Sequence, residues 1–117
     1  MNSFARRRIS ACAGALLAIV CIVDAANAED ATVNIDNFTF APAQLTVKAG
    51  TTVIWRNEDD IPHTVASSTR AFKSKALDTD DRFSFTFRDA GTYEYFCSLH
   101  PHMKGAITVE PATHAAK

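Results

Sequence analysis

The sequence predicts an all-β fold, a sandwich of about seven short strands, on three observations. Residues 29–110 hold no stretch with the apolar period of an amphipathic helix. Apolar and polar residues instead alternate in short runs, as they do in half-buried strands. Pro, Gly, Asn and Asp separate these runs at the close spacing that is typical of an antiparallel sandwich.

The residues support some of these strands more strongly than others. Residues 52–55 are β-branched and aromatic, so they should form a central strand. Residues 83–87 place three Phe on one face, with Ser and Thr on the other, which indicates a strand that faces the core. Residues 67–81 are polar and irregular, with at most one short strand near Ala76 and Leu77. In chain order, the expected strands cover residues 31–40, 44–47, 52–55, 63–66, 83–87, 93–97 and 106–109.

The N-terminal segment has the features of an export signal. Three arginines precede an apolar run at residues 9–23, and Ala26-Asn27-Ala28 fits a cleavage site. A retained membrane anchor is the alternative, but a run of about 15 residues is short for a span that needs ~20. We therefore expect a signal peptide at residues 1–28, a folded domain at 29–110, a flexible tail at 111–117 and a periplasmic protein. Both the general and the twin-arginine export routes stay open.

The charge balance argues against a nucleic-acid partner. The leader carries three Arg and one Asp, so the rest of the chain holds 9 Lys and Arg against 12 Asp and Glu, a net charge of about −3. Domains that bind nucleic acids present basic stripes to the phosphates, and this sequence has no such stripe. Mild acidity favours solubility and suits a partner with a basic docking patch.

Cleavage of the leader would leave a single cysteine. Cys12 and Cys21 lie within the leader, so Cys97 remains alone and has no partner for an internal disulfide. A lone thiol in an exported protein is either a buried, inert side chain or a metal-bound thiolate. The His and Met residues that follow Cys97 at ligand spacing favour the metal.

Residues 95–103 read Tyr-Phe-Cys-Ser-Leu-His-Pro-His-Met and form a soft donor set. Cys97, His100 and Met103 follow one another at three-residue steps, and His63, in Ile-Pro-His-Thr-Val, supplies a second imidazole. A Cys with two His and a weak axial Met is the blue-copper geometry used for electron transfer. The sequence therefore predicts one type 1 copper ion, with Cu(I) and Cu(II) states.

These motifs resemble the cupredoxins, the type 1 blue copper proteins, and most closely the amicyanin type with its short Cys-x-x-His-x-x-Met loop. The resemblance spans residues 44–110 and is strongest at residues 47–50 with the following Trp55, at 61–65 and at 87–110. It implies a Greek-key β-sandwich in which His63, Cys97 and His100 are equatorial ligands and Met103 is the axial one. It also implies that His63 is buried, with its other ring nitrogen bonded to a backbone carbonyl or water. His100 would then be the electron port, inside an apolar docking patch.

Three positions depart from the amicyanin pattern. Thr64 stands where the family has an Asn that pins the ligand loop, and Leu99 stands where it has a Pro. His102 replaces a Phe, which leaves it open as a titratable surface group or as an alternative ligand. These changes leave copper binding in place but make the usual partner, methylamine dehydrogenase, an open question.

The expected function is that of a periplasmic electron carrier, not an enzyme, because the four ligands leave no open coordination position. Larger redox proteins would be its partners, for example a periplasmic dehydrogenase as donor and a c-type cytochrome as acceptor. We expect a monomer that binds no nucleic acid and has no stable membrane association after cleavage. The alternative is a copper-storage or copper-delivery protein, although such proteins usually carry clusters of Met and Cys, and residues 29–117 hold one of each.

Overall fold

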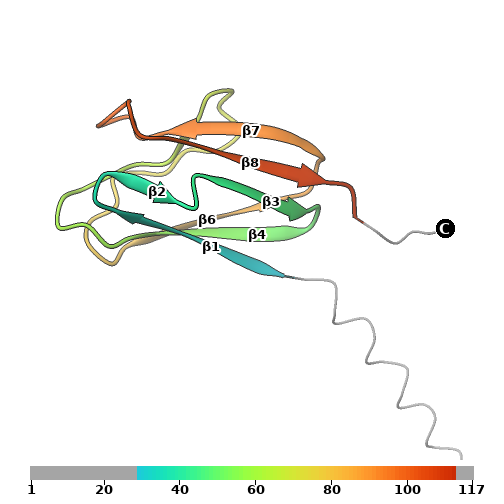
Figure 1. The fold of residues 1–117 in the computed structure, drawn as a ribbon, viewed down its shortest axis with the longest axis horizontal. Coiled ribbons are helices and arrows are strands. Elements are labelled where there is room, and N and C mark those ends of the chain that lie inside the picture. Colours follow the sequence, from blue (N-terminus) through green and yellow to red (C-terminus); the bar gives the residue numbers. More distant parts are fainter. Residues whose placement is uncertain (1–28, 113–117) are drawn as a thin grey trace, which may run out of the picture.

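The computed structural model describes residues 29–112, which form two four-stranded sheets packed face to face (Figure 1). The expected signal peptide and residues 113–117 of the expected tail lie outside the described residues. The first sheet has the order β2-β1-β4-β6, with β1 (Asp30–Asp36), β2 (Thr39–Ala41), β4 (Thr51–Asn57) and β6 (Arg82–Phe87). The second has the order β3-β8-β7-β5, with β3 (Gln44–Lys48), β5 (Ala66–Ser67), β7 (Gly91–Phe96) and β8 (Lys104–Glu110).

The all-β sandwich is confirmed, but the expectation of purely antiparallel sheets is wrong. β1 runs parallel to β4, and β3 runs parallel to β8. Figure 1 shows the reason, because β2 and β3 run on in the same direction as the chain crosses from one sheet to the other. The chain then returns in β4 with the direction of β1. Within residues 29–112 we find no helix with the length and apolar character needed to cross a membrane.

The expected single strand over residues 31–40 is in fact a tight hairpin. Asp36 of β1 pairs with Thr39 of β2, so only Asn37 and Phe38 form the turn. Both have positive φ, 53° and 56°, as the two central residues of a type I′ hairpin turn require. Asn is common in such a turn, but Phe is not. The Asn-Phe pair is therefore a weak turn signal, and the sequence was interpreted as one strand.

The core lies between the sheets and is centred on Trp55 of β4. As predicted, β4 is a central strand, and its side chains are alternately buried and half-buried. The Phe stripe of β6 is only partly core, since Phe87 is buried while Phe83 and Phe85 are half-buried. β6 is the edge strand of its sheet, so part of its inner face lies beyond the cover of the opposite sheet.

The segment that carries His63 is less regular than expected. Of residues 63–66, only Ala66 belongs to a strand, and the expected strand near Leu77 is a single bridge to His63. Two backbone hydrogen bonds make this bridge, from His63 N to Leu77 O (3.1 Å) and from Leu77 N to His63 O (2.7 Å). The Ser74 hydroxyl accepts the N–H of Val65, so a side chain replaces the strand partner that this N–H would otherwise need.

Close packing between β7 and β8 predicts the effect of one substitution. A Cβ atom at Gly105 would lie 2.5 Å from Cζ of the buried Tyr95 ring, its partner across the ladder. Gly105→Ala should therefore lower the free energy of unfolding by about 1–3 kcal/mol, the usual cost of overpacking. Urea denaturation followed by Trp55 fluorescence measures it. The penalty should shrink in a Tyr95→Phe background, which lacks the hydroxyl that the new methyl would meet first, and an equal penalty in both backgrounds would contradict this explanation.

Candidate metal centre

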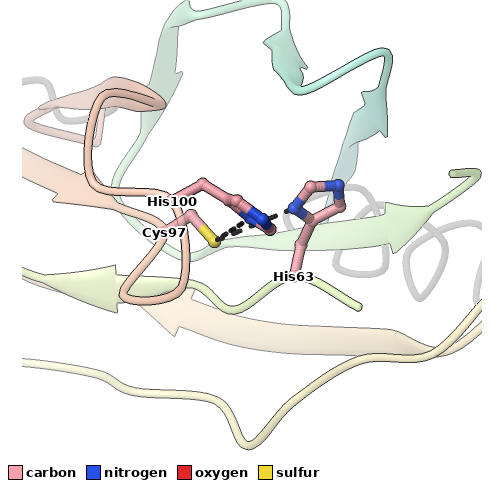
Figure 2. Close-up of side chains that lie close together, drawn as sticks. All are labelled: His63, Cys97 and His100. Atoms are coloured by element: carbon pink, nitrogen blue, oxygen red, sulfur yellow. Dashed lines mark hydrogen bonds between the residues drawn. The ribbon is translucent and has the colours of Figure 1, made fainter. Parts of the chain in front are cut away.

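Three donor atoms converge at the end of the sandwich where β7 ends (Figure 2). The Sγ atom of Cys97 lies 3.8 Å from Nδ1 of His63 and 3.7 Å from Nδ1 of His100. All three donor atoms lie within 4.8 Å of one another, and the thiol and the first imidazole are fully buried. The structure thus brings together three of the four residues that the sequence predicts as ligands.

Strand pairing accounts for this convergence. β5 pairs with β7, with Ala66 opposite Phe96, so the residues before β5 lie beside those that follow β7. His63 precedes β5 by three residues, and Cys97 follows β7 directly. The segments that carry His63 and Cys97 are therefore neighbours at one end of the fold, as binding of one ion by both residues requires.

The loop from Cys97 to Met103 is closed by its own backbone. Cys97 N donates to Met103 O (3.1 Å), His100 N donates to Cys97 O (3.2 Å), and Met103 N donates to His100 O (2.9 Å). Met103 is 2% exposed, so its thioether lies within the protein and not in solvent. The fourth predicted residue therefore sits on the same rigid loop as the thiol and the second imidazole.

Thr64 ties the two ligand segments together. Its backbone N–H donates to Cys97 Sγ over 3.3 Å, and its hydroxyl accepts the backbone N–H of Ser98 (2.7 Å). The same hydroxyl lies 2.7 Å from the Ser98 hydroxyl. These contacts fix the sulfur and the residue after it relative to the segment that carries His63. The Thr in place of the family's Asn thus still pins the loop, through hydroxyl bonds to the residue after Cys97.

Asp59 fixes the orientation of His63. Nε2 of His63 bonds Oδ2 of Asp59 over 2.7 Å, so the expectation of a backbone carbonyl or water as its partner is wrong. Burial raises the pKa of Asp59, but hydrogen bonds from the N–H groups of Phe38 and Asn37 and from His63 outweigh it and lower the pKa to about 2. An ionised Asp59 accepts a hydrogen bond from the Nε2–H group of His63. Nδ1 of His63 is then left with a free lone pair toward the sulfur, as in metal sites whose His ligands bond a carboxylate.

Phe38 packs against both imidazole rings. Its ring centroid lies 5.4 Å from that of His63 and 5.1 Å from that of His100, edge to face in both cases. The sequence predicts a single strand through Phe38 and assigns no role to Asp59, so both of these site residues were missed. The signals available were the Asn37-Phe38 pair between two alternating runs and a carboxylate four residues before a ligand His.

His102 lies apart from the three donors. It is exposed, and its ring centroid is 6.5 Å from that of His100, whereas the His63 and His100 rings are 5.0 Å apart. Leu99 is 50% exposed and His100 is half-buried. His102 is therefore placed as a surface group next to the site, not as a fourth donor within it.

The chemistry of this donor set fits copper. A buried thiol sulfur, one buried imidazole and one half-buried imidazole meet there, with a buried thioether on the same loop as the thiol. Soft sulfur ligands select copper(I), and imidazole suits copper as well. Hydrogen bonds with Asp59 and Thr64 orient the His63 ring and the Cys97 sulfur.

Comparison with known proteins supports the same conclusion. The family profile of the cupredoxin-like domain matches residues 10–109. Amicyanin from Paracoccus versutus is 36% identical over 88 residues, which cover 71% of this chain and 67% of that protein. Plastocyanin from Scenedesmus fuscus is 38% identical over 84 residues, 61% of this chain and 86% of that protein. Among solved structures, a novel purple cupredoxin from Nitrosopumilus maritimus matches with a TM-score of 0.66 and 36% identity, over 69% of this chain and 100% of that one.

The pKa of Asp59 predicts how stability depends on pH. Because this pKa is about 2 in the folded protein and 3.8 ordinarily, the ionised carboxylate stabilises the fold above about pH 4. That contribution, about 2 kcal/mol, should disappear as the pH falls from 4 to 2. In Asp59→Asn, this part of the pH dependence should be absent. Urea unfolding of the metal-free protein at several pH values measures it.

The control for this experiment is Asp36→Asn, which changes an exposed carboxylate beside the same turn. The control should keep the pH dependence of the unaltered protein. Parallel stability curves for Asp59→Asn and the unaltered protein between pH 4 and pH 2 would contradict the role given to Asp59.

Proposed function

We propose that this chain, which belongs to the cupredoxin-like family of one-copper electron carriers, shuttles single electrons between larger redox proteins in the periplasm. The observation that carries the proposal is the convergence of one buried thiol and two imidazoles at one end of a rigid sandwich. The proposed ligands are His63, Cys97, His100 and Met103. The copper supplies a reversible one-electron change between Cu(II) and Cu(I).

The chain's own residues would keep the ligands still during that change. Copper(II) and copper(I) favour different arrangements, so ligands that move little keep the energy of reorganisation small. His63 is fixed by its bridge to Leu77 and its bond to Asp59. Cys97 is fixed by the end of β7 and by the N–H of Thr64. Each restraint belongs to the fold itself and would act in both oxidation states.

His100 is the proposed point of electron entry and exit. Its ring is half-buried while that of His63 is buried, so His100 offers the shorter path to solvent. Among residues 29–112, the exposed large apolar side chains are those of Phe38 and Leu99. Phe38 contacts the His100 ring, and Leu99 precedes His100 in the chain. A small apolar surface around a redox centre suits partners that bind briefly and then part.

Burial of the donors argues against the alternative role in copper delivery. Handing metal to another protein requires that an incoming ligand reach the ion. The thiol of Cys97 and the ring of His63 have no exposed surface, and Met103 is also buried. Such a site retains its metal and exposes only one edge of one ligand, which suits electron exchange better than metal exchange.

The proposed location of the protein follows from its N-terminal segment. An export signal at residues 1–28 with a domain at 29–110 would place the protein in the periplasm. A periplasmic dehydrogenase as donor and a c-type cytochrome as acceptor are the proposed classes of partner. Leu99 and His102 depart from the amicyanin pattern on the surface that a partner would contact, so we propose these classes of partner and not methylamine dehydrogenase in particular.

Removal of the thiolate tests the ligand assignment. The copper(II) protein should absorb visible light intensely, because the sulfur–copper bond gives a charge-transfer band. Cys97→Ser should abolish that band, whereas Ser98→Ala, next to it in the chain, should keep it. A visible spectrum recorded during copper titration measures both. A colourless copper-loaded protein would refute the electron-carrier proposal.

A second pair of variants tests the two neighbouring imidazoles. His100→Gly should open the site to solvent and shift or quench the visible band, and added imidazole should restore it by filling the gap. His102→Ala should leave the band and the reduction potential unchanged, because its ring lies outside the donor cluster. Loss of the band in His102→Ala would show that His102, not His100, is the ligand.

A further inference from the structure

Phe38 occupies a backbone position that disfavours it. Its φ of 56° lies in the left-handed region, where bulky side chains are rare and Gly is preferred. The position is the second of a two-residue hairpin turn that begins with Asn37, and Asn-Gly is the usual pair there. A residue held in such a conformation points to surroundings that fix it and often to a function.

The carboxylate of Asp59 fixes this turn. Oδ1 accepts the N–H of Asn37 (2.6 Å) and Oδ2 accepts the N–H of Phe38 (3.0 Å). These bonds join the β1–β2 hairpin to the loop after β4, more than 20 residues further along the chain. The same Oδ2 atom lies 2.7 Å from Nε2 of His63. One carboxylate therefore holds both the hairpin tip and the first imidazole.

The ring of Phe38 extends this restraint to the second imidazole. Its edge-to-face contacts to His63 and His100 have interplanar angles of 85° and 89°. Core burial does not explain its place, because the side chain is 42% exposed. What the ring covers is the pair of imidazoles, at the cost of an unfavourable backbone conformation.

We propose that Phe38 and Asp59 form a clamp that holds both imidazole rings facing the Cys97 thiol before copper binds. Asp59 acts directly on His63, and it acts on His100 through the hairpin turn and the ring of Phe38. Both are positioning residues, because neither is a metal ligand. The clamp rests on the proposed function in that His63 and His100 are taken as the ligands.

Phe38→Gly is the variant that tests the clamp. Gly suits the left-handed turn, so the variant should unfold at the same urea concentration or a higher one. In the metal-free protein, NMR relaxation of ¹⁵N-labelled imidazole should show increased motion of the His100 ring. Release of copper(I) to excess bicinchoninate should be about fivefold faster, the loss expected for an aromatic contact.

Two controls separate the ring from the turn. Arg70→Gly relieves another left-handed residue, φ 69°, at an exposed position that is not part of the donor cluster, and it should change neither His100 motion nor copper release. Phe38→Tyr keeps the ring and should restore both values. If Phe38→Gly leaves His100 motion and copper release unchanged, the clamp does not exist.

Asp59→Asn completes the test of coupling. Loss of an outer partner of a His ligand typically lowers metal affinity about 10- to 100-fold. Combined with Phe38→Gly, the effect on copper release should be smaller than the product of the two single effects, since both changes break one clamp. Independent, multiplicative effects would overturn the coupling. A colourless copper-loaded protein would refute the proposed function instead, and His100 motion in the metal-free protein would still decide the clamp.

Discussion

The short pairing of β5 with β7 is the interaction on which the rest of this structure depends. It consists of two residue pairs, yet it places the residues that precede β5 beside the residues that follow β7. Without it, the segments that carry the first imidazole and the thiol would not be neighbours in the sheet. The larger sheets supply the stiffness, with Trp55 and its aromatic neighbours filling the space between them. Because β5 pairs with β7, the sheets also hold the His63 nitrogen and the Cys97 sulfur at a fixed distance from each other.

Local chemistry made much of the site predictable. Cys97, His100 and Met103 lie within seven residues, so their spacing could be read directly. His63 was found because the blue-copper set needs a second imidazole, which the Ile-Pro-His-Thr-Val motif supplies. Asp59 and Phe38 were missed for a physical reason. Their roles arise from contacts between a hairpin tip and a loop more than 20 residues away. An Asp or a Phe in a sequence does not by itself indicate such a long-range contact.

The fold was predictable to a similar depth. Alternation showed the strands, and β-branched and aromatic residues identified the central strand β4. Whether neighbouring strands run parallel or antiparallel could not be predicted from the sequence, because it depends on where the chain crosses from one sheet to the other. The turn within residues 31–40 was also missed, although the alternation shifts by one residue at Asp36 and Asn37, because Phe is an unusual second residue for such a turn. The extent of burial on β6 likewise depends on its place at an edge, which only the sheet order gives.

The burial of Cys97 has a consequence for the life of the protein before it acquires its metal. Among the described residues it is the free cysteine, and its sulfur has no surface open to solvent. In an oxidising compartment, exposed thiols couple to one another or are oxidised further by peroxide. A sulfur enclosed beneath two imidazoles and Thr64 is shielded from both reactions. Burial thus keeps the thiol of a newly made chain available for copper, even where copper is scarce.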